Sequence, residues 1–231
     1  MTAPLVEARA VGRRFGGRSA LRDVTVRAAA GETLALAGPN GAGKSTLLAL
    51  LAGALRPSSG SVAITGRLGY VPQQPALWRR LTVRENLRLV ARLAGARDAE
   101  QVLEASGLAD VADRRVEVLS IGQAQRASIA AGLIGEPDVL LLDEPTAALD
   151  PRQRRLVWEL VAAVPARGGA IVFTTQNVEE VPLHADRLVA LADGAVAFEG
   201  SAADLRDRLG SPDHERFEDA FARFLDEEAR G

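Results

Sequence analysis

The segment GPNGAGKST, residues 38 to 46, brings glycines, a lysine and two hydroxyl groups together in a short stretch. It follows the pattern of a glycine, four residues and then Gly-Lys-Ser/Thr. The glycines let the backbone point its N–H groups at a phosphate, and a helix beginning here adds the positive end of its dipole. The lysine would reach the β- and γ-phosphates of a nucleotide, and the serine hydroxyl after it would bind Mg2+. The candidate contacts are therefore Gly38, Asn40, Gly41, Ala42, Gly43, Lys44, Ser45 and Thr46.

Lys44 is the only lysine in the chain, whose other positive side chains are all arginines. A lysine ammonium is a compact point charge, whereas an arginine guanidinium is a broad planar fork. The use of lysine at this one position favours a specific contact with phosphate over a general need for positive charge.

An acidic segment, VLLLDEP at 139 to 145, can supply the rest of such a site. Its apolar residues predict a buried strand, which would carry Asp143 to the edge of a sheet. There Asp143 can hold Mg2+ through a water molecule, and Glu144 can accept a proton from an attacking water. The segment therefore predicts the metal-holding and hydrolytic half of the site. The alternative is a pair of acids that merely ends a strand.

Strands and helices must alternate around these segments to bring them together. TLALAG, at 33 to 38, is apolar on both faces, as expected of a strand in a covered parallel sheet. Two strands precede it, at 5 to 11 and 21 to 28. After the acidic segment, a helix opened by Pro151 leads to the strand AIVFTT and completes a β-α-β alternation. The sequence thus predicts an α/β fold built on a parallel sheet.

Two stretches outside this alternation have helical character. Residues from about 74 to 136 carry apolar residues at helical spacing and predict an inserted helical subdomain. The chain closes with a hairpin around Asp193 and Gly194 and a helical tail from about 201 to 231. An apolar stripe on the last helix either docks on the protein's own body or contacts another subunit. The stripe consists of Phe217, Phe221, Phe224 and Leu225.

Composition limits the kinds of partner that the chain can have. Its 231 residues are 47% hydrophobic, enough for the core of one domain with an insertion. A net charge of -2 and a pI near 5.8 argue against nucleic acid as a partner, because nucleic-acid-binding proteins usually carry a basic excess. No cysteine and two scattered histidines exclude thiolate and histidine metal clusters. We expect no signal peptide and no membrane span, so the location should be cytoplasmic and any membrane role should come through a partner.

A third segment, LSIGQAQR at 119 to 126, lies between the two halves of the predicted site. The order of phosphate loop, VPQQ, LSIGQAQR, LLDEP and AALD resembles that of the ATP-binding-cassette ATPases across essentially the whole chain. The resemblance implies a single domain over residues 1 to 231. Its fold would be a P-loop NTPase, RecA-like core with an N-terminal antiparallel β subdomain and an inserted helical subdomain. The ligands would be ATP and Mg2+.

The resemblance also assigns roles to further residues. In that family the signature of one subunit completes the ATP site of the other in a head-to-tail dimer, which implies contacts from Ser120, Gly122 and Gln123. Ile121 departs from the commonest signature, which has a glycine there. Phe15 stands where an aromatic ring stacks on adenine, although it could instead belong to the core.

Three more positions match the family with an alternative beside each. Gln73 matches the glutamine that senses Mg2+, and its neighbour Gln74 is the rival for that role. Asp150 matches the acid that communicates across the dimer, and an aspartate at the start of a helix is also an ordinary cap. The family's transporters receive a helix of the membrane subunit in a groove whose counterpart here includes QPALWRRLTVREN. Trp78 in that stretch either contacts such a partner or packs locally.

Gln176, in FTTQNVEE, departs from the family pattern. A histidine usually stands there, touches the γ-phosphate and helps to arrange water and Glu144. A neutral amide donates a weaker hydrogen bond, worth about 0.5 to 1.5 kcal/mol against about 1.5 to 3 kcal/mol for a charged donor. Three hypotheses follow: the amide still orients water and the site turns over, hydrolysis is slow, or a different ATPase subunit supplies the histidine. The otherwise intact site favours the first.

These residues can now be given predicted roles. The candidate catalytic residues are Glu144, Gln176 and Lys44, and the candidate metal-holding residues are Ser45, Gln73 and Asp143. The chain is predicted to be the ATP-hydrolysing subunit of an ABC transporter of the exporter-type branch. It would drive a separate membrane permease at the inner face of the cell membrane through closure and reopening of a dimer with an identical or different ATPase subunit. The alternatives are a non-transport assembly factor and a regulatory subunit that holds ATP with little turnover.

Overall fold

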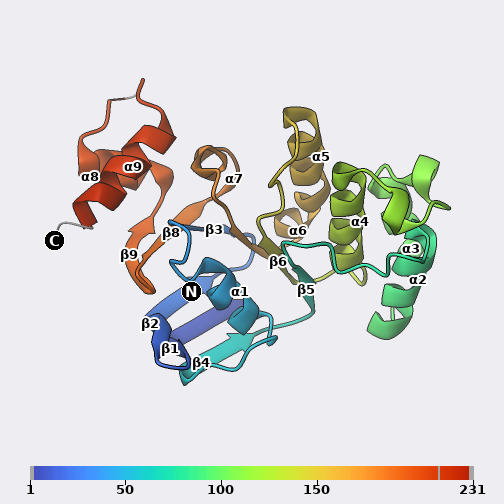
Figure 1. Cartoon of the computed structure of the whole chain (residues 1–231), viewed down its shortest axis with the longest axis horizontal. Helices are drawn as coiled ribbons and strands as arrows, with labels where there is room; N and C mark the ends of the chain where they lie inside the picture. The colour runs from blue at the N-terminus through green and yellow to red at the C-terminus, as the bar shows by residue number, and fades with distance from the viewer. Residues whose placement is uncertain (1–2, 213, 229–231) are drawn as a thin grey trace.

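The computed structural model describes residues 3–212 and 214–228. Its centre is a six-stranded sheet in the order β5-β6-β7-β3-β8-β9 (Figure 1). Neighbouring strands run parallel from β5 to β8, and β9 is antiparallel to β8. The parallel arrangement confirms the predicted α/β class. The strands are β3 (Thr33–Ala37), β5 (Leu68–Val71), β6 (Val139–Asp143), β7 (Ala170–Thr174), β8 (Arg187–Ala192) and β9 (Ala195–Gly200).

The three central strands β3, β6 and β7 are buried along their whole length. Alternate residues point to opposite faces, so that Leu140 and Phe173 lie in one core while Leu141 and Val172 lie in the other. Both faces are covered, which is why these strands appear in the sequence as unbroken apolar runs. Because the strands are parallel, their carboxyl ends lie at the same edge of the sheet.

A second, antiparallel sheet in the order β2-β1-β4 covers one face together with α1. Its first two strands are longer than predicted, and β4 was not predicted at all. The sequence of β4 begins Ser-Gly-Ser, and its residues are exposed or half-buried, so it lacks the apolar alternation that indicates a strand. The elements are β1 (Val6–Phe15), β2 (Arg18–Ala28), β4 (Ser59–Ile64) and α1 (Lys44–Leu51).

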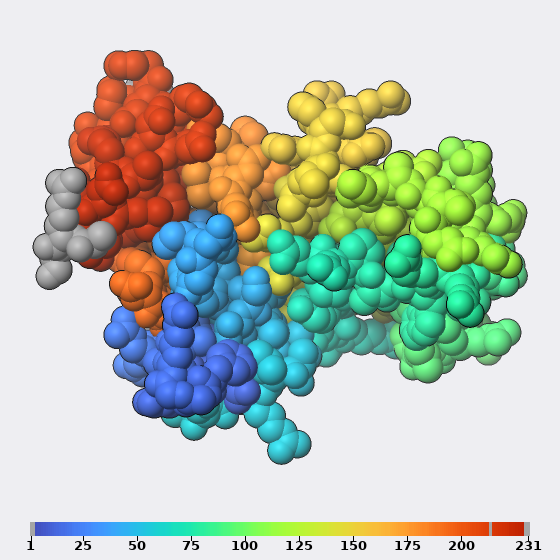
Figure 2. All heavy atoms as spheres, in the orientation of Figure 1, coloured from blue at the N-terminus to red at the C-terminus, as the bar shows by residue number. Residues whose placement is uncertain are grey.

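Helices fill most of the segment from 74 to 136 and share a small core of their own. The first of them begins at Val83, because Thr82 and Glu85 form a reciprocal capping box that fixes its start. In the space-filling view this helical segment forms one end of the molecule, and the C-terminal helices form the other (Figure 2). The helices are α2 (Val83–Ala94), α3 (Ala99–Ala105) and α4 (Ile121–Leu133).

The remaining helices lie on the sheet face opposite α1. Between β8 and β9, Asp193 and Gly194 both have positive φ values, 46° and 78°, as the predicted tight hairpin requires. The apolar stripe of the last helix packs into the protein's own core: Phe217, Phe221 and Phe224 are buried, and Leu225 is partly buried against them. The elements are α5 (Pro151–Val161), α6 (Ala163–Ala166), α7 (Val181–His184), α8 (Ala202–Leu209) and α9 (Phe217–Glu228).

Candidate functional site

The phosphate loop connects β3 to α1 and depends on glycine at two tight positions. Gly38 has φ 144°, and a Cβ atom there would lie 2.2 Å from the carbonyl oxygen of Leu191. Gly43, the residue that precedes α1, has φ 106°, and its Cβ would lie 2.6 Å from Leu21 Cδ2. A side chain would be strained at both positions, so the loop can curve against β8 and β2 only with glycine there.

Lys44 lies inside the curve of this loop. Its side chain is 5% exposed, and Nζ donates hydrogen bonds to the carbonyl oxygens of Gly38 at 2.7 Å and Pro39 at 3.0 Å. Burial lowers the pKa of the Lys44 ammonium, and the nearby carboxylates of Glu144 and Asp143 act in the opposite direction. The ammonium is thus positioned at the inner wall of an anion-sized loop.

Asp143, at the end of β6, is linked to two hydroxyl groups. Its Oδ1 accepts a hydrogen bond from Ser45 Oγ at 3.1 Å and one from Thr174 Oγ1 at 2.5 Å. A hydroxyl and a carboxylate so close together form the kind of oxygen donor pair that Mg2+ prefers, either directly or through water. Within residues 3–212 and 214–228 no group of three histidine, cysteine or acidic side chains could hold a metal ion. The residues present therefore fit a cation whose other ligands come from water and a nucleotide.

Glu144 follows Asp143 with the left-handed φ of 48°, which is uncommon for a residue with a side chain. Its backbone N–H donates to Thr174 Oγ1 at 2.9 Å, so that β7 supports this turn. The two oxygens of its carboxylate accept from two different amides, Gln73 Nε2 at 3.2 Å and Gln176 Nε2 at 2.6 Å. The carboxylate is aimed by residues that follow β5 and β7, on either side of its own strand β6.

These side chains enclose a pocket of about 360 Å3. The predicted residues that line it are Asn40, Gly41, Gly43, Lys44, Ser45, Thr46, Gln73, Glu144 and Gln176. Asp143 lies beneath it through its bond to Ser45. Two members of the predicted loop are placed elsewhere: the Ala42 side chain packs in the core, and Gly38 borders a neighbouring pocket near α9. Between the two glutamines considered for one role, Gln73 is the one that contacts Glu144.

Phe15 lines an adjoining pocket of about 490 Å3 together with Gly41 and Thr46 of the loop. Its side chain is 46% exposed, so it does not belong to the core. The guanidinium carbon of Arg13 lies 4.6 Å from the ring centroid and covers part of the ring. A flat ring beside the phosphate loop is suited to stack on a nucleotide base.

The signature residues do not line the phosphate pocket. Ser120 caps α4: its Oγ accepts from Gln123 N at 3.2 Å, and Gln123 Oε1 accepts from Ser120 N at 3.0 Å. Gly122 is buried, and a Cβ atom there would lie within 2.6 Å of three side-chain atoms of Gln153 in α5. The three predicted contacts, Ser120, Gly122 and Gln123, therefore stand together at the start of α4, apart from the phosphate pocket.

Asp150 and Trp78 also lie outside the pocket. The Asp150 side chain accepts from Gln153 N at 2.9 Å and caps α5, as an aspartate before a proline predicts. Trp78 is 49% exposed, and only its backbone is tied locally, through hydrogen bonds with Asn86 at 2.8 Å and 3.1 Å. The stretch before α2 therefore leaves about half of Trp78 exposed at the surface.

Two residues that connect the site were not predicted. Thr174 bonds to both Asp143 and the backbone of Glu144, and Glu180 accepts hydrogen bonds from Thr146 and Thr175. A threonine at the end of an apolar strand and an acid in a short helical turn are common, so neither carries a distinctive signal. The position of Thr174, directly across from Asp143 in the β6–β7 register, could have identified it once the strands were paired.

The described part of the chain holds no helix that combines the length and the apolar character needed to span a lipid bilayer.

Comparison with other proteins identifies relatives along most of the chain. The family described as "ABC transporter" matches residues 21–147, more than half of the sequence. The daunorubicin resistance ATP-binding protein DrrA3 of Streptomyces coeruleorubidus is 39% identical over 216 residues, which is 86% of this chain and 68% of that protein. The Nod factor export ATP-binding protein I of Burkholderia lata is 38% identical over 214 residues, 85% of this chain and 70% of the relative.

Solved structures give the same result. An ATP-binding subunit of an ABC transporter superposes with a TM-score of 0.86 at 27% identity and covers 95% of this chain and 99% of its own. A dimeric ATP-binding cassette in a post-hydrolysis state, bound to ADP and Pi, superposes with a TM-score of 0.78 at 28% identity over 85% of this chain and 98% of its own. With the phosphate loop and the Asp143–Glu144 pair in place, these similarities show that the chain belongs to the ABC transporter family, as an ATP-binding subunit that hydrolyses ATP.

Proposed function

We propose that Glu144 is the group that activates water in this ATPase, and that Gln73 and Gln176 hold it in position. The observation that carries the proposal is the pair of amide hydrogen bonds to the Glu144 carboxylate, at 3.2 Å and 2.6 Å, beside the pocket of the phosphate loop. A carboxylate held in this way would still have oxygen lone pairs available for a water in the pocket. Glu144 would accept the proton of that water as the water attacks the γ-phosphate.

The other site residues bind and orient the nucleotide. Lys44 Nζ would exchange its bonds with the loop carbonyls for phosphate oxygens, and the loop N–H groups would hold the same phosphates. Ser45 and Asp143 would hold Mg2+, assisted by the Gln73 amide oxygen. When bound, Mg2+ neutralises charge on the phosphates. Phe15 would stack on the adenine.

A second copy of the chain would complete each site. Ser120, Gly122 and Gln123 stand at the start of α4, where the positive end of the helix dipole favours an anion. They do not line the pocket of their own chain, so a γ-phosphate in that pocket can meet them only on another subunit. Asp150, which is exposed at the start of α5, would contact the partner. We favour a homodimer because one chain supplies both half-sites.

The membrane partner is proposed by analogy with the relatives, whose names refer to daunorubicin resistance and Nod factor export. A permease subunit would dock beside Trp78, and the export direction and the substrate would be those of the permease. Detergent extraction followed by affinity purification of the chain should recover an integral membrane protein. Recovery with soluble partners alone would instead favour an assembly factor.

The role of Glu144 and Gln176 is tested by steady-state phosphate release with Mg-ATP. The wild-type chain should turn over, and Glu144→Gln should lower kcat by at least about 100-fold, since general-base groups contribute that much. Gln176→Ala should release phosphate more slowly than the wild type, because the Glu144 carboxylate loses a hydrogen-bond donor. Gln176→His should retain activity. An inactive wild type that Gln176→His restores would contradict the proposal and indicate a subunit that holds ATP.

A further inference from the structure

A buried carboxylate outside the phosphate pocket joins two segments of the site. Glu180, in the short helical turn Val178–Glu180, is only 4% exposed. Its Oε2 accepts a hydrogen bond from Thr146 Oγ1 at 2.9 Å and lies 3.3 Å from Thr175 Oγ1, whose single hydrogen can be donated either to Glu180 or to the carbonyl oxygen of Asn177 at 3.1 Å. Thr146 stands two residues after Glu144, and Thr175 directly precedes Gln176. One carboxylate oxygen therefore connects the segment after β6 with the tip of β7.

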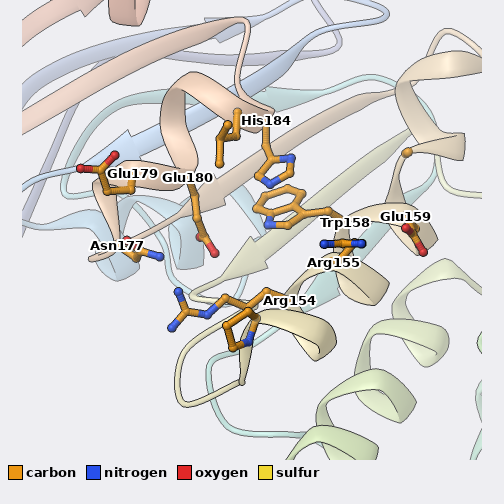
Figure 3. Close-up of a pocket in the computed structure, with 11 residues that line it drawn as sticks. Arg154, Arg155, Trp158, Glu159, Asn177, Glu179, Glu180 and His184 are labelled. Atoms are coloured by element: carbon orange, nitrogen blue, oxygen red, sulfur yellow. The ribbon is translucent and has the colours of Figure 1, made fainter. Parts of the chain in front are cut away.

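The surroundings of Glu180 make a purely structural role costly. Its Oε1 is buried and has no hydrogen-bond partner among the described residues, and neither has Trp158 Nε1, which lines the same pocket of about 610 Å3. Figure 3 shows the Glu180 carboxylate pointing into this pocket from the side of Asn177 and Glu179, toward Arg154. Burying a carboxylate with one free oxygen lowers stability, since polar groups in the interior need partners. An apolar side chain would fill the space with less cost.

Glu180 also borders the hydrolytic residues through its two threonines. A smaller pocket of about 150 Å3 is lined by Glu144, Thr146, Thr175, Gln176 and neighbouring residues. Thr146 and Thr175 are both buried, so solvent does not compete with Glu180 for their hydroxyl hydrogens. The positions of Glu144 and Gln176, whose side chains meet at 2.6 Å, are thus tied to one another a second time through the hydroxyls beneath them.

We propose that Glu180 is a positioning residue for ATP hydrolysis. By bonding Thr146 and Thr175 together, it fixes the Gln176 amide relative to the Glu144 carboxylate and fixes the start of the segment that runs to Asp150. Glu180 contacts neither nucleotide nor water in the reaction and acts only through the two hydroxyls. The inference rests on the proposed roles of Glu144 and Gln176, so the test includes one measurement that does not depend on turnover.

The first arm of the test compares Glu180→Ala with Glu180→Gln. Glu180→Ala should lower kcat by about tenfold to hundredfold, the usual effect of a small displacement of reacting groups, with little change in KM for ATP. Glu180→Gln should retain most of the activity, because an amide oxygen can accept both threonine hydrogens. The control is Glu179→Ala, which removes the neighbouring, more exposed acid that pairs with Arg216. Equal losses in Glu180→Ala and Glu180→Gln, or none in either, would overturn the proposal.

The second arm uses Thr175→Val, which removes the hydroxyl that contacts Glu180 and the Asn177 backbone and keeps a β-branched side chain directly after β7. Thr175→Val should lower kcat in the wild type but cause no further loss in Glu180→Ala, since both changes break the same connection. Additive losses would count against the proposal.

The third arm follows hydrogen–deuterium exchange in the nucleotide-free chain. Glu180→Ala should speed exchange in peptides covering residues 145–150 and 175–178 and leave the helical segment unchanged. If the wild type shows no turnover, the proposed function fails while this arm still decides on Glu180. Unchanged exchange in both peptides would refute the positioning role on its own.

Discussion

At the scale of single residues, the Glu144 carboxylate is held by two groups that do not titrate. Gln73 and Gln176 both donate through neutral amides. A histidine at position 176 would change its charge between pH 5 and 8, whereas an amide stays neutral throughout that range. The two donors to Glu144 therefore keep the same charge over this range, without the stronger hydrogen bond that a charged donor would form.

His184, which packs against α5, is a residue that does titrate in this range. The His184 ring stacks on Trp158 at a centroid distance of 4.2 Å, and burial lowers the pKa of His184 below its ordinary value. The unfolded chain therefore binds a proton more readily than the folded chain does at mildly acidic pH. The contribution of neutral His184 to stability is fully present above the ordinary histidine pKa. It is lost as the pH falls through the lowered pKa of His184 in the folded chain. The free energy of unfolding should decrease from pH 8 to pH 5.5.

His184→Phe tests this prediction because it keeps a ring on Trp158 and removes the titration. Urea unfolding at both pH values should show a smaller acid loss in this variant than in the wild type, while His214→Gln, a change at an exposed histidine, should match the wild type. An identical acid loss in His184→Phe would mean that other groups are responsible. The other charged residues that line the pocket next to His184 and Trp158 are Arg154, Arg155, Glu159, Glu179 and Glu180.

Some contacts of single site residues could be predicted from the sequence, and others could not. The phosphate loop could be predicted because its residues are contiguous and each has a separate chemical reason. The contact of Gln73 and Gln176 with one carboxylate could not, since it depends on β5, β6 and β7 ending side by side. Glu180 was not predicted, because its partners lie 34 and five residues away and no sequence spacing indicates such a contact.

At the scale of elements, the apolar stripe of α9 is part of the core rather than a docking face. Phe224 is fully buried, and its ring centroid lies 6.0 Å from that of Phe198 in β9. Phe224→Ala should lower the free energy of unfolding by about 3 to 5 kcal/mol, the usual effect of emptying a buried phenylalanine site. ATP affinity should stay close to the wild-type value. Chemical denaturation and nucleotide titration measure the two quantities.

Phe15→Ala is the matched control, because it truncates a phenylalanine that is 46% exposed. It should change stability little and weaken ATP binding by about 1 to 3 kcal/mol, as expected for the loss of base stacking on an aromatic ring. A large stability loss in Phe15→Ala, or a normal stability in Phe224→Ala, would contradict the placement of these rings.

Element boundaries were predicted where local chemistry determines them. The α5 start at Asp150 and Pro151 and the hairpin at Asp193 and Gly194 depend on caps and turns that neighbouring residues set. The strand β4 could not be predicted in this way, because it forms through pairing with β1, which is distant in sequence. Its stability comes from tertiary contact rather than from its own composition.

At the scale of the whole molecule, the phosphate-loop pocket and the proposed signature residues at the start of α4 are separate, since none of the latter lines that pocket. Lys44 and Ser120 should therefore act in the same ATP site only across a dimer. Lys44→Ala and Ser120→Arg should each be inactive alone, and a mixture of the two should regain up to about a quarter of wild-type turnover. Random pairing makes half of the dimers mixed, and each mixed dimer has one intact site. Phosphate release from the mixture is the measurement.

Mixing Lys44→Ala with Glu144→Gln provides the control. Both changes fall on the phosphate-loop half of the site, so no mixed dimer contains an intact site and no activity should return. Recovery in this control, or its absence in the first mixture, would contradict a head-to-tail arrangement.

The buried position of Lys44 has a consequence for the covalent chemistry of the protein. As the only lysine, it is the sole side-chain amine that acylating reagents, lysine-specific proteases or enzymatic acyl transfer can reach. It is also almost inaccessible, with its nitrogen bonded to the loop it supports. The Lys44 amine of the folded chain is thus shielded from modification, and any lysine adduct that forms on it records an opening of the phosphate loop.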